Sequence, residues 1–466
     1  MQKEWSRREM LRIMGMLSAG TALTPAVLGN VRIITREYAP DWGVYSKPKK
    51  PVTAITLGAG NRGNVYGGYA VKYPDELDIV GVAEPIPVRN ERYAKLHNIP
   101  AKQRFTTWEH VFQVPKFADA IIITTPDDLH YGPAMKALEM GYHLLLEKPI
   151  AQTWQECSDI LQQAKRHNRI VAVCHVLRYS PYYRKVKEVM DSGLLGAIVS
   201  VQHFEPIEHK HMAHSFVRGN WRRAADTNPI ILAKSCHDLD ILRWWIGKNC
   251  RYISSFGSLK WFREANAPAG STARCTDGCA VEAECPYSAL RIYYRNRERN
   301  YVFDLPENKE QQAAYVLQQL KEGPYGRCVY RCDNDQPDHL VLAMEFDDDI
   351  TASFNMEAFT HYAGRRTRIM GSLGDLVGDE DELYIANFRT GDIEHWRVKD
   401  HVAELSGHAG GDFGLARDWV NAIDKNDPAL LTSTLDASME SHLMAFQSEK
   451  ARLNRTVEMV DLGDSK

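Results

Sequence analysis

Glycines at three positions of one short loop are the first residues whose type and spacing could do chemistry. Gly58, Gly60 and Gly63 follow an apolar run and precede a segment compatible with a helix. A pyrophosphate group requires glycines at such a turn, because it must approach bare backbone and the N-terminal amides of the next helix. A second apolar run ends at Glu84, about 20 residues further on, where an acid can bind the hydroxyls of an adenosine ribose. The pattern predicts a dinucleotide site that includes Gly58, Gly60, Asn61, Arg62, Gly63 and Glu84.

The acid at the end of the second run also bears on which dinucleotide binds. A carboxylate at Glu84 would repel a 2′-phosphate, so we expect NAD rather than NADP. Arg62, Arg89 and Arg92 leave NADP as the less favoured alternative, because a nearby arginine can accommodate that phosphate. The alternative to a dinucleotide site is a glycine turn in some other α/β protein.

Polar residues follow the later apolar runs as well. We expect strands at 55–57, 79–83, 120–124, 143–146 and 170–174, alternating with helices, which is typical of a doubly wound parallel sheet. Ligands bind at the carboxyl ends of the strands of such a sheet. The ends of two strands supply Thr125, Pro126 and His130, then Glu147 and Lys148, and we expect all five beside the cofactor.

The tripeptide Glu147-Lys148-Pro149 and the segment from Lys234 to Gly247 resemble motifs of the glucose-fructose oxidoreductase and inositol dehydrogenase family, Gfo/Idh/MocA. The resemblance runs from about residue 52 to the C-terminus. It implies that Lys148 lies beside the substrate and the nicotinamide, and that His237 is a second catalytic residue in the first turn of a helix. Proline restricts the residue before it, which favours an extended Lys148. The alternatives are a surface lysine and a histidine that only caps its helix.

Chemistry and periodicity agree with these roles. A neutral imidazole can take the proton of a carbinol as its hydride leaves, and an ammonium favours the developing alkoxide. Leu239, Leu242 and Ile246 predict the buried stripe of the helix, and Gly247 its end. Relatives often carry an acid four residues before the histidine, but this chain has Ala233 there. Lys234, Asp238 and Asp240 are therefore expected at the substrate, although either aspartate could instead stabilise the helix start.

Histidines gather upstream of that helix, at His209, His211 and His214. Alternation along a strand would put the first two on one face, and a metal there could acidify a hydroxyl. We prefer substrate binding, because histidine, arginine and tryptophan together suit the hydroxyls and apolar faces of a polyol. The predicted substrate contacts are Arg178, Tyr179, His209, His211, His214, Trp221, Lys234, Asp238 and Asp240.

Cysteines form a second cluster. Cys275, Cys279 and Cys285 lie close together in sequence, and Cys328 and Cys332 follow. In an oxidising compartment one or two disulfides would cross-link this loop-rich insertion, whereas in a reducing compartment the thiolates could bind structural zinc. We expect a structural role in either case, because no base adjoins them.

The N-terminus differs from the remainder of the chain. Arg7 and Arg8 precede an uncharged, weakly apolar stretch over 13–29, which resembles a twin-arginine export signal. Its proline and small residues make it a poor membrane span. The location is therefore expected to be the periplasm or cell envelope, with a cytoplasmic protein carrying a basic N-terminal arm as the alternative.

Composition is that of a globular protein, with 44% hydrophobic and 25% charged residues and a net charge of -3. No basic stripe suggests nucleic acid. Antiparallel strands are expected at 198–204, 253–259, 340–346, 350–357, 366–370 and 383–388, with late helices at 408–423, capped by Asp412, and 434–452. We therefore predict an α/β protein made of a signal (1–30), a linker (31–50), an NAD-binding Rossmann domain (51–175), a C-terminal α+β domain with a large open sheet (176–450, with the cysteine insertion at 257–335) and a tail (451–466).

These expectations combine into a function. We expect NAD-dependent hydride transfer from a secondary alcohol of a sugar, cyclitol or sugar derivative. The alternative is a glycosidase that retains NAD and uses transient oxidation to eliminate a glycosidic bond. A third hypothesis is a non-catalytic sugar-binding module on the same fold, against which the presence of both Lys148 and His237 argues. The resemblance also implies a homo-oligomer built on the outer face of the sheet.

Overall fold

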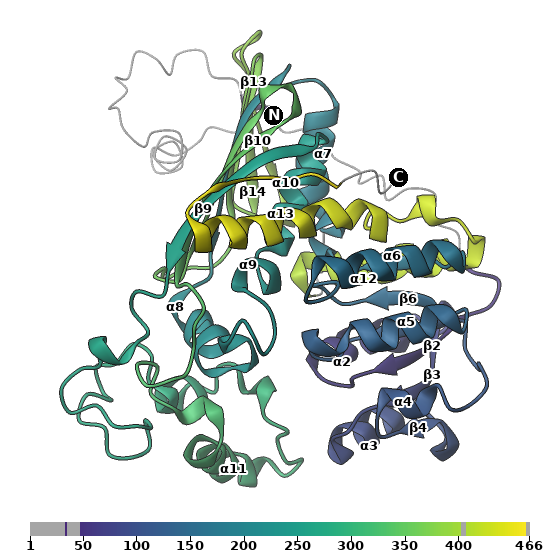
Figure 1. Cartoon of the computed structure of the whole chain (residues 1–466), viewed down its shortest axis with the longest axis vertical. Helices are drawn as coiled ribbons and strands as arrows, with labels where there is room; N and C mark the ends of the chain where they lie inside the picture. Colours follow the sequence, from purple (N-terminus) through teal and green to yellow (C-terminus); the bar gives the residue numbers. More distant parts are fainter. Residues whose placement is uncertain (1–32, 35–46, 402–406, 463–466) are drawn as a thin grey trace.

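The computed structural model describes residues 33–34, 47–401 and 407–462. The predicted export signal and most of the predicted linker lie outside these residues. The described chain forms two sheets with helices packed on them, and Figure 1 shows the smaller sheet beside the larger one. In the described part of the chain, no helix is both long and apolar enough to cross a membrane.

The first sheet is the predicted doubly wound one. Its six strands are all parallel, in the order β4-β3-β2-β5-β6-β7. The order reverses at β2, which has β3 on one side and β5 on the other, and ligands bind at such a switch point. The strands are β2 (Val52–Leu57), β3 (Leu77–Ala83), β4 (Arg104–Phe105), β5 (Ala120–Ile123), β6 (His143–Leu146) and β7 (Val171–Val173).

Helices cover both faces of this sheet, because its strands are apolar on both sides. One face packs against α2 (Asn61–Lys72), α3 (Pro87–Leu96) and α12 (Gly411–Lys425), which contributes Leu415 and Trp419. The other packs against α4 (Trp108–Val111), α5 (Tyr131–Glu139), α6 (Trp154–Arg166) and α13 (Leu435–Asn454). The last two helices of the chain thus return to the N-terminal sheet.

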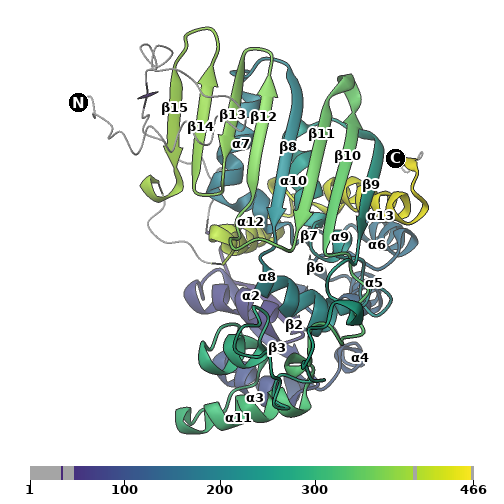
Figure 2. The ribbon, with the colours of Figure 1, turned by 90° about the vertical axis from the view of Figure 1, so that its left-hand side faces the viewer.

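The second sheet has ten strands in the order β1-β15-β14-β13-β12-β8-β11-β10-β9-β16 and is mainly antiparallel, with parallel pairs at β1/β15 and β8/β11. Figure 2 shows this sheet face on. The strands are β1 (Ile33–Ile34), β8 (Ile198–Pro206), β9 (Cys250–Ser258), β10 (His339–Phe346), β11 (Thr351–Glu357), β12 (Arg366–Gly371), β13 (Gly374–Gly378), β14 (Glu382–Asn387), β15 (Ile393–Arg397) and β16 (Val457–Met459). The predicted fold class is confirmed.

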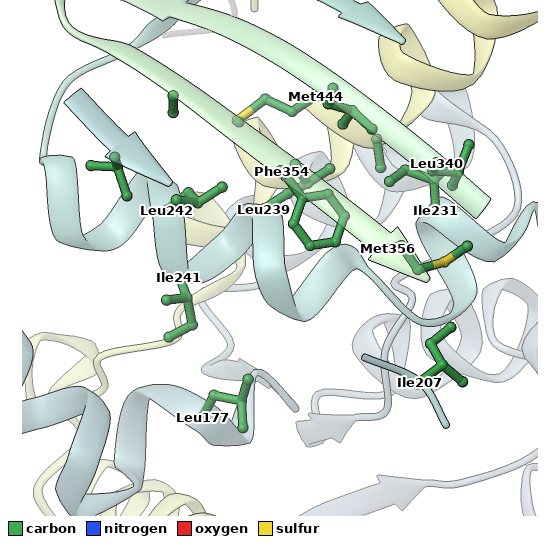
Figure 3. Close-up of a cluster of buried hydrophobic side chains, with 14 of the residues drawn as sticks. Leu177, Ile207, Ile231, Leu239, Ile241, Leu242, Leu340, Phe354, Met356 and Met444 are labelled. Atoms are coloured by element: carbon green, nitrogen blue, oxygen red, sulfur yellow. The ribbon is translucent and has the colours of Figure 1, made fainter. Parts of the chain in front are cut away.

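One face of the large sheet packs against α7 (Pro181–Asp191), α9 (Ile230–Ala233), α10 (Cys236–Ile246) and α13. Leu239 and Leu242 of α10 are fully buried against Phe354 and Met356 of β11, as Figure 3 shows. The predicted stripe of α10 is confirmed, and the helix ends at Gly247, whose φ of +69° suits a residue without a side chain.

The chain between β9 and β10 forms the cysteine-bearing insertion. It contains α11 (Lys309–Glu322) and a small core of its own around Ile292, Val316 and Leu320. Asp304 of this insertion accepts a hydrogen bond from Arg89 of α3 at 2.7 Å. The insertion therefore contacts the nucleotide domain directly.

Candidate active site

The glycine loop between β2 and α2 has the form that a dinucleotide requires. At Gly58, φ is +91° and a Cβ atom would lie 2.7 Å from the Thr124 carbonyl oxygen, while at Gly63 it would lie 2.2 Å from the Gly58 oxygen. At Gly60 the nearest atom would be Nη1 of Arg89, at 3.9 Å. Two glycines thus allow close packing, and the third leaves open backbone where a pyrophosphate can approach. The residues present fit NAD.

Glu84 lies beside this loop, directly after β3. Its side chain is buried, and the carboxylate accepts hydrogen bonds from the backbone amides of Ala59 (2.8 Å) and Ile86 (2.9 Å). The carboxylate therefore lies where it can accept hydrogen bonds from ribose hydroxyls and repel a 2′-phosphate. Arg89 is ion-paired with Asp304, and Arg92 contacts the carbonyl oxygen of Leu305. Two of the three arginines that could favour NADP in the sequence are thus engaged by the insertion.

Arg62 points away from a cofactor-binding role and into an ion-pair network. Its Nε lies 2.5 Å from Oε1 of Glu147 and its Nη2 lies 2.7 Å from Oδ1 of Asp412. Burial raises the pKa of the Glu147 carboxyl, but Arg62 and Lys148 outweigh burial and hold that pKa below its usual range. Glu147 is therefore an anion that orders the strand end, where it also accepts from the Lys148 amide at 3.0 Å.

The prediction that Asp412 caps its helix is wrong. The residue before α12 is Gly410, and no side chain caps the helix. The Asp412 carboxylate instead accepts a hydrogen bond from the Arg62 guanidinium and lies 3.0 Å from Nδ1 of His408. Burial raises its pKa, but His408 and Arg62 lower it to about 2. Local sequence could not show this, because Arg62 is far away in the chain.

Lys148 and His237 meet at the carboxyl edge of the parallel sheet. The Lys148 ammonium donates to the Ala233 carbonyl oxygen at 2.7 Å, next to the start of α10. The resemblance implies an acid at position 233, but Ala233 stands there and only its backbone oxygen contacts Lys148. His237 is 6% exposed, and its Nδ1 is buried without a hydrogen-bond partner in the part of the chain that the structure describes. Burial, and then Lys148, His175 and His408, hold the pKa of His237 well below its usual range.

Two further histidines flank His237 and a third contacts one of them, and their role was not predicted. The ring centre of His237 lies 6.0 Å from that of His175 and 6.1 Å from that of His408, and His175 lies 5.4 Å from His442. His175 is fully buried, its Nε2 lies 3.6 Å from Oδ1 of Asp240, and neither ring nitrogen has a hydrogen-bond partner among the described residues. The side chain of His408 is 42% exposed and is oriented by Asp412. The available signal was the position of His175 directly after a strand.

The ends of strands β5 and β6 are joined by His130. This side chain is buried, and its two ring nitrogens lie 2.7 Å and 3.1 Å from the carbonyl oxygens of Pro149 and Thr125. Asp127, which the sequence did not single out, accepts from the indole Nε1 of Trp221 at 3.2 Å. This contact places Trp221 of the second domain against the end of β5.

The expected strand through the histidine cluster is wrong. His209–His211 form the short helix α8, and Met212–Arg218 continue as a π-helix. Glu208 starts the turn with φ at +77°, and its carboxylate accepts from the amides of Lys210 and His211. Three residues are too few to show whether side chains repeat with the period of a helix or of a strand, so the sequence pattern could not distinguish a helix from a strand here.

The histidines of this cluster diverge. His214 points into the insertion, where Nδ1 lies 2.7 Å from the Tyr293 hydroxyl and the ring stacks on Tyr325. Burial, then Arg299 and Arg218, lower its pKa to about 3. His209 is partly exposed and lies 3.1 Å from the Thr360 carbonyl oxygen, and His211 faces Lys234. Of these three, His209 and His211 keep positions that a substrate could reach.

Four other predicted substrate contacts lie in buried ion pairs or hydrogen bonds. Asp240 binds the Arg178 guanidinium through both oxygens at 2.6 and 2.7 Å, and Tyr179 bonds with Ser433. Asp238 is fully buried against Arg365 and His203. The placement of Arg178, Tyr179, Asp238 and Asp240 does not match a substrate-contacting role, because no polar atom is left facing solvent. Lys234 donates to Glu205 at 2.6 Å and remains partly exposed.

Cysteines in the described part of the chain are all free, so the predicted disulfides are not formed there. No three His, Cys, Asp or Glu side chains among the described residues lie close enough together to hold one metal ion. Cys275, Cys279 and Cys285 alone therefore do not support the predicted structural zinc.

Comparisons with known proteins agree with this geometry. The family model described as the oxidoreductase family's NAD-binding Rossmann fold matches residues 53–175, and that of its C-terminal alpha/beta domain matches residues 187–459. YteT of Bacillus subtilis, which is named as an oxidoreductase, is 25% identical over 365 residues, covering 74% of this chain and 83% of YteT.

Two further similarities are to a curated enzyme and to a solved structure. The scyllo-inositol 2-dehydrogenase (NAD(+)) of Bacillus subtilis is 27% identical over 212 residues, covering 45% of this chain and 58% of that enzyme. A solved levoglucosan dehydrogenase in complex with NADH and levoglucosan superimposes with a TM-score of 0.65, at 17% identity, over 88% of this chain and 100% of that one. The latter shows the shared fold.

Proposed function

The chain belongs to the Gfo/Idh/MocA oxidoreductase family, and we propose that it oxidises a secondary alcohol of a sugar, cyclitol or sugar derivative with NAD. The observation that carries this proposal is the pair formed by Lys148 and His237 at the carboxyl edge of the NAD-binding sheet. The similarity to an inositol dehydrogenase supports the substrate class.

The two side chains divide the chemistry between them. His237 is neutral near pH 7, because burial and Lys148 oppose its protonation, so the imidazole can accept the hydroxyl proton of the substrate. The Lys148 ammonium donates a hydrogen bond to the Ala233 carbonyl oxygen. Its positive charge stabilises the negative charge that develops on the hydroxyl oxygen of the substrate as the proton leaves. When bound, NAD supplies the hydride acceptor. His209, His211, Lys234 and Trp221 are the proposed substrate contacts.

A direct assay tests the proposal. We expect reduction of added NAD, followed by absorbance, with at least one member of a panel of cyclitols, aldoses and anhydrosugars. Lys148→Met should lower the rate of NAD reduction about 10²–10³-fold while retaining NAD binding, whereas Lys136→Met, at an exposed lysine paired with Glu139 on α5, should behave as the parent. NAD reduction at the rate of the parent in Lys148→Met would contradict the assignment.

A second candidate is a glycosidase that retains NAD, and the arrangement of His408 favours it. Elimination of a glycosidic bond needs a further acid or base to serve the leaving group. His408 is partly exposed, is oriented by Asp412 and lies beside His237. The protein should be denatured after purification without added cofactor and the released nucleotide identified. Near-stoichiometric NAD or NADH, with cleavage of an aryl glycoside that His408→Ala abolishes, would select this candidate.

We further propose export and self-association. Arg7 and Arg8 support a twin-arginine signal, which fractionation of cells carrying the parent or an Arg7→Lys, Arg8→Lys variant would test. The outer face of the large sheet exposes Phe256 and Val341, which are register partners on β9 and β10. Apolar side chains on one face suit an interface between copies, and Phe256→Glu should then lower the mass measured by light scattering.

A further inference from the structure

Residues 298–305 of the insertion form a strap that begins beside the proposed substrate contacts. Glu298 forms an ion pair with Lys210 at 3.0 Å, and Arg299 forms one with Glu208 at 3.1 Å. Both partners belong to α8 and the turn that starts it, which also carry two of the proposed substrate contacts. The first residues of the strap are therefore held on the substrate side of the site.

The other end of the strap lies beside the cofactor loop. Nε of Arg89 lies 2.7 Å from Oδ1 of Asp304. Nη1 of the same arginine would be the nearest atom, at 3.9 Å, to a Cβ atom placed on Gly60. Burial lowers the pKa of Arg89, but Asp304 and then Glu84 raise it above its usual range. Arg89 therefore lies among the strap, the open backbone of the glycine loop and the acid expected to bind the ribose.

A segment that contacts both ends of this site runs alongside whatever binds there. The glycine loop receives the pyrophosphate and α8 lies toward the substrate, so a dinucleotide bound between them would lie next to the strap. Figures 1 and 2 show α11 of the insertion at the same end of the molecule as α3 of the nucleotide domain. The strap therefore borders the cofactor site.

The strap is fixed to the insertion by aromatic packing. Phe303 is 8% exposed, and its ring centre lies 5.7 Å from that of Tyr293 and 5.8 Å from that of Tyr325. Arg297 and Arg299 have φ values of +55° and +57°, in the left-handed region that side chains disfavour. Strain of this kind persists where the surroundings fix the chain, and it gathers at ligand clamps and switch regions. The strap thus has a defined conformation and is not a loose loop.

The contacts at both ends of the strap can open in water. The side chains of Arg89 and Asp304 are 30% and 25% exposed, and those of Lys210 and Glu298 are 30% and 35% exposed. Partly exposed ion pairs contribute little to stability, so they can break and form again. The small core of the insertion keeps it folded while they do so.

We propose that the strap closes over the bound dinucleotide and that the pair of Arg89 and Asp304 is its latch. The inference rests on the proposed function in one respect, namely that NAD binds at the glycine loop. The cofactor leaves when the latch opens, so the strap sets the rate of cofactor release. Slow release suits an enzyme that reoxidises its NADH in place.

Charge distinguishes a latch from a simple electrostatic effect. Asp304 is an acid near the place of the pyrophosphate, so its negative charge by itself would repel the cofactor. If Asp304 acts only through its charge, its removal should speed the binding of NADH and slow its release. If Asp304 holds the latch, its removal should speed both binding and release.

Stopped-flow fluorescence of NADH binding to the full-length protein, and of its release into excess NAD, tests the proposal. Asp304→Ala should raise the rate constants of binding and release about threefold or more. Glu298→Gln should also speed release, although it lies at the opposite end of the strap from the cofactor loop. Glu264→Gln, at an exposed acid of the insertion paired with Arg331, should behave as the parent.

Hydrogen exchange gives a second readout on the strap itself. Saturating NADH should slow exchange of the amides of 298–305 in the parent, and Asp304→Ala should weaken that protection. NADH release from Asp304→Ala that is unchanged or slower than from the parent would overturn the latch. If that variant does not fold, unchanged release from Glu298→Gln overturns it instead. A parent protein that binds no NADH would refute the proposed function itself, and the strap with it.

Discussion

Gly60→Ala should separate dinucleotide binding from folding. A Cβ atom at Gly60 would meet nothing closer than 3.9 Å, and the φ of -75° is one that alanine adopts readily. We expect the free energy of unfolding to change by less than about 1 kcal/mol, since the lost freedom of the unfolded chain offsets a poorer N-cap. The added methyl group occupies the place where the pyrophosphate must approach the backbone.

The expected loss of affinity follows from the hydrogen bonds at that place. A hydrogen bond from a backbone amide to a charged oxygen contributes roughly 1.5–3 kcal/mol. Loss of one such bond should weaken NAD binding about 10- to 150-fold. Titration calorimetry measures this, and urea denaturation of the same preparation measures the stability.

Two matched variants complete the design. Gly63→Ala would place its Cβ atom 2.2 Å from the Gly58 carbonyl oxygen, so the backbone must move, and we expect a loss of about 1–3 kcal/mol in stability as well as of binding. Gly68→Ala, on the same helix, would meet only the Phe413 ring at 4.0 Å and should bind NAD as the parent does. A stable Gly60→Ala protein that binds NAD within twofold of the parent would refute the placement of the pyrophosphate.

Three other predictions concern the catalytic pair and the buried histidines. Lys148→Met should lower kcat about 10²–10³-fold with NAD affinity nearly unchanged, because its ammonium acts on charge that develops during the reaction; an equal loss in NAD affinity by calorimetry would argue against this. The kcat/KM profile should stay flat from pH 8 down to about pH 6.5 and fall only below it, because burial and Lys148 lower the pKa of His237; an acid limb centred at or above pH 7 would contradict a neutral, buried base. Burial lowers the pKa of His97 and His143 to about 4 and of His214 and His442 to about 3, so as the pH falls these side chains bind protons in the unfolded chain before they do so in the folded chain. The stability of the folded protein should therefore be independent of these groups above about pH 6.5 and should decrease as the pH falls toward 4. An unchanged urea midpoint across that pH range would show that they are not buried.

Features with a strong local pattern could be predicted from the sequence. The strands β2, β3, β5 and β6 follow from apolar runs rich in β-branched residues. The three glycines follow from a backbone that must stay free of side chains, and the helix that carries His237 follows from apolar residues repeated about every 3.6 positions. β13 and β15 were missed, because Gly374–Gly378 is bounded by glycines and Ile393–Arg397 contains three polar residues. Both strands exist because their neighbours in the sheet offer register partners.

Residues whose partners are distant in the chain could not be assigned from the sequence. Asp238 and Asp240 follow His237 directly, and their charge suggested the substrate, but Arg365 and Arg178 occupy them. Arg218 stood in a run of histidines that suggested sugar binding, yet its side chain turns to the thiols of the insertion. For the two aspartates the charge was visible in the sequence, and the arginines that balance it were not.

One chain of polar contacts links the cofactor loop to the second imidazole of the site. Arg62 of α2 binds Glu147 beside Lys148 and also binds Asp412 of α12, which in turn bonds to His408. Asp412 is anionic, because His408 and Arg62 outweigh burial and lower its pKa to about 2, and its carboxylate lies 3.0 Å from Nδ1 of His408. Arg62 therefore does more than follow the glycine loop. It binds Glu147, which accepts a hydrogen bond from the Lys148 amide, and Asp412, which orients His408, so the positions of both acid-base groups depend on the same guanidinium.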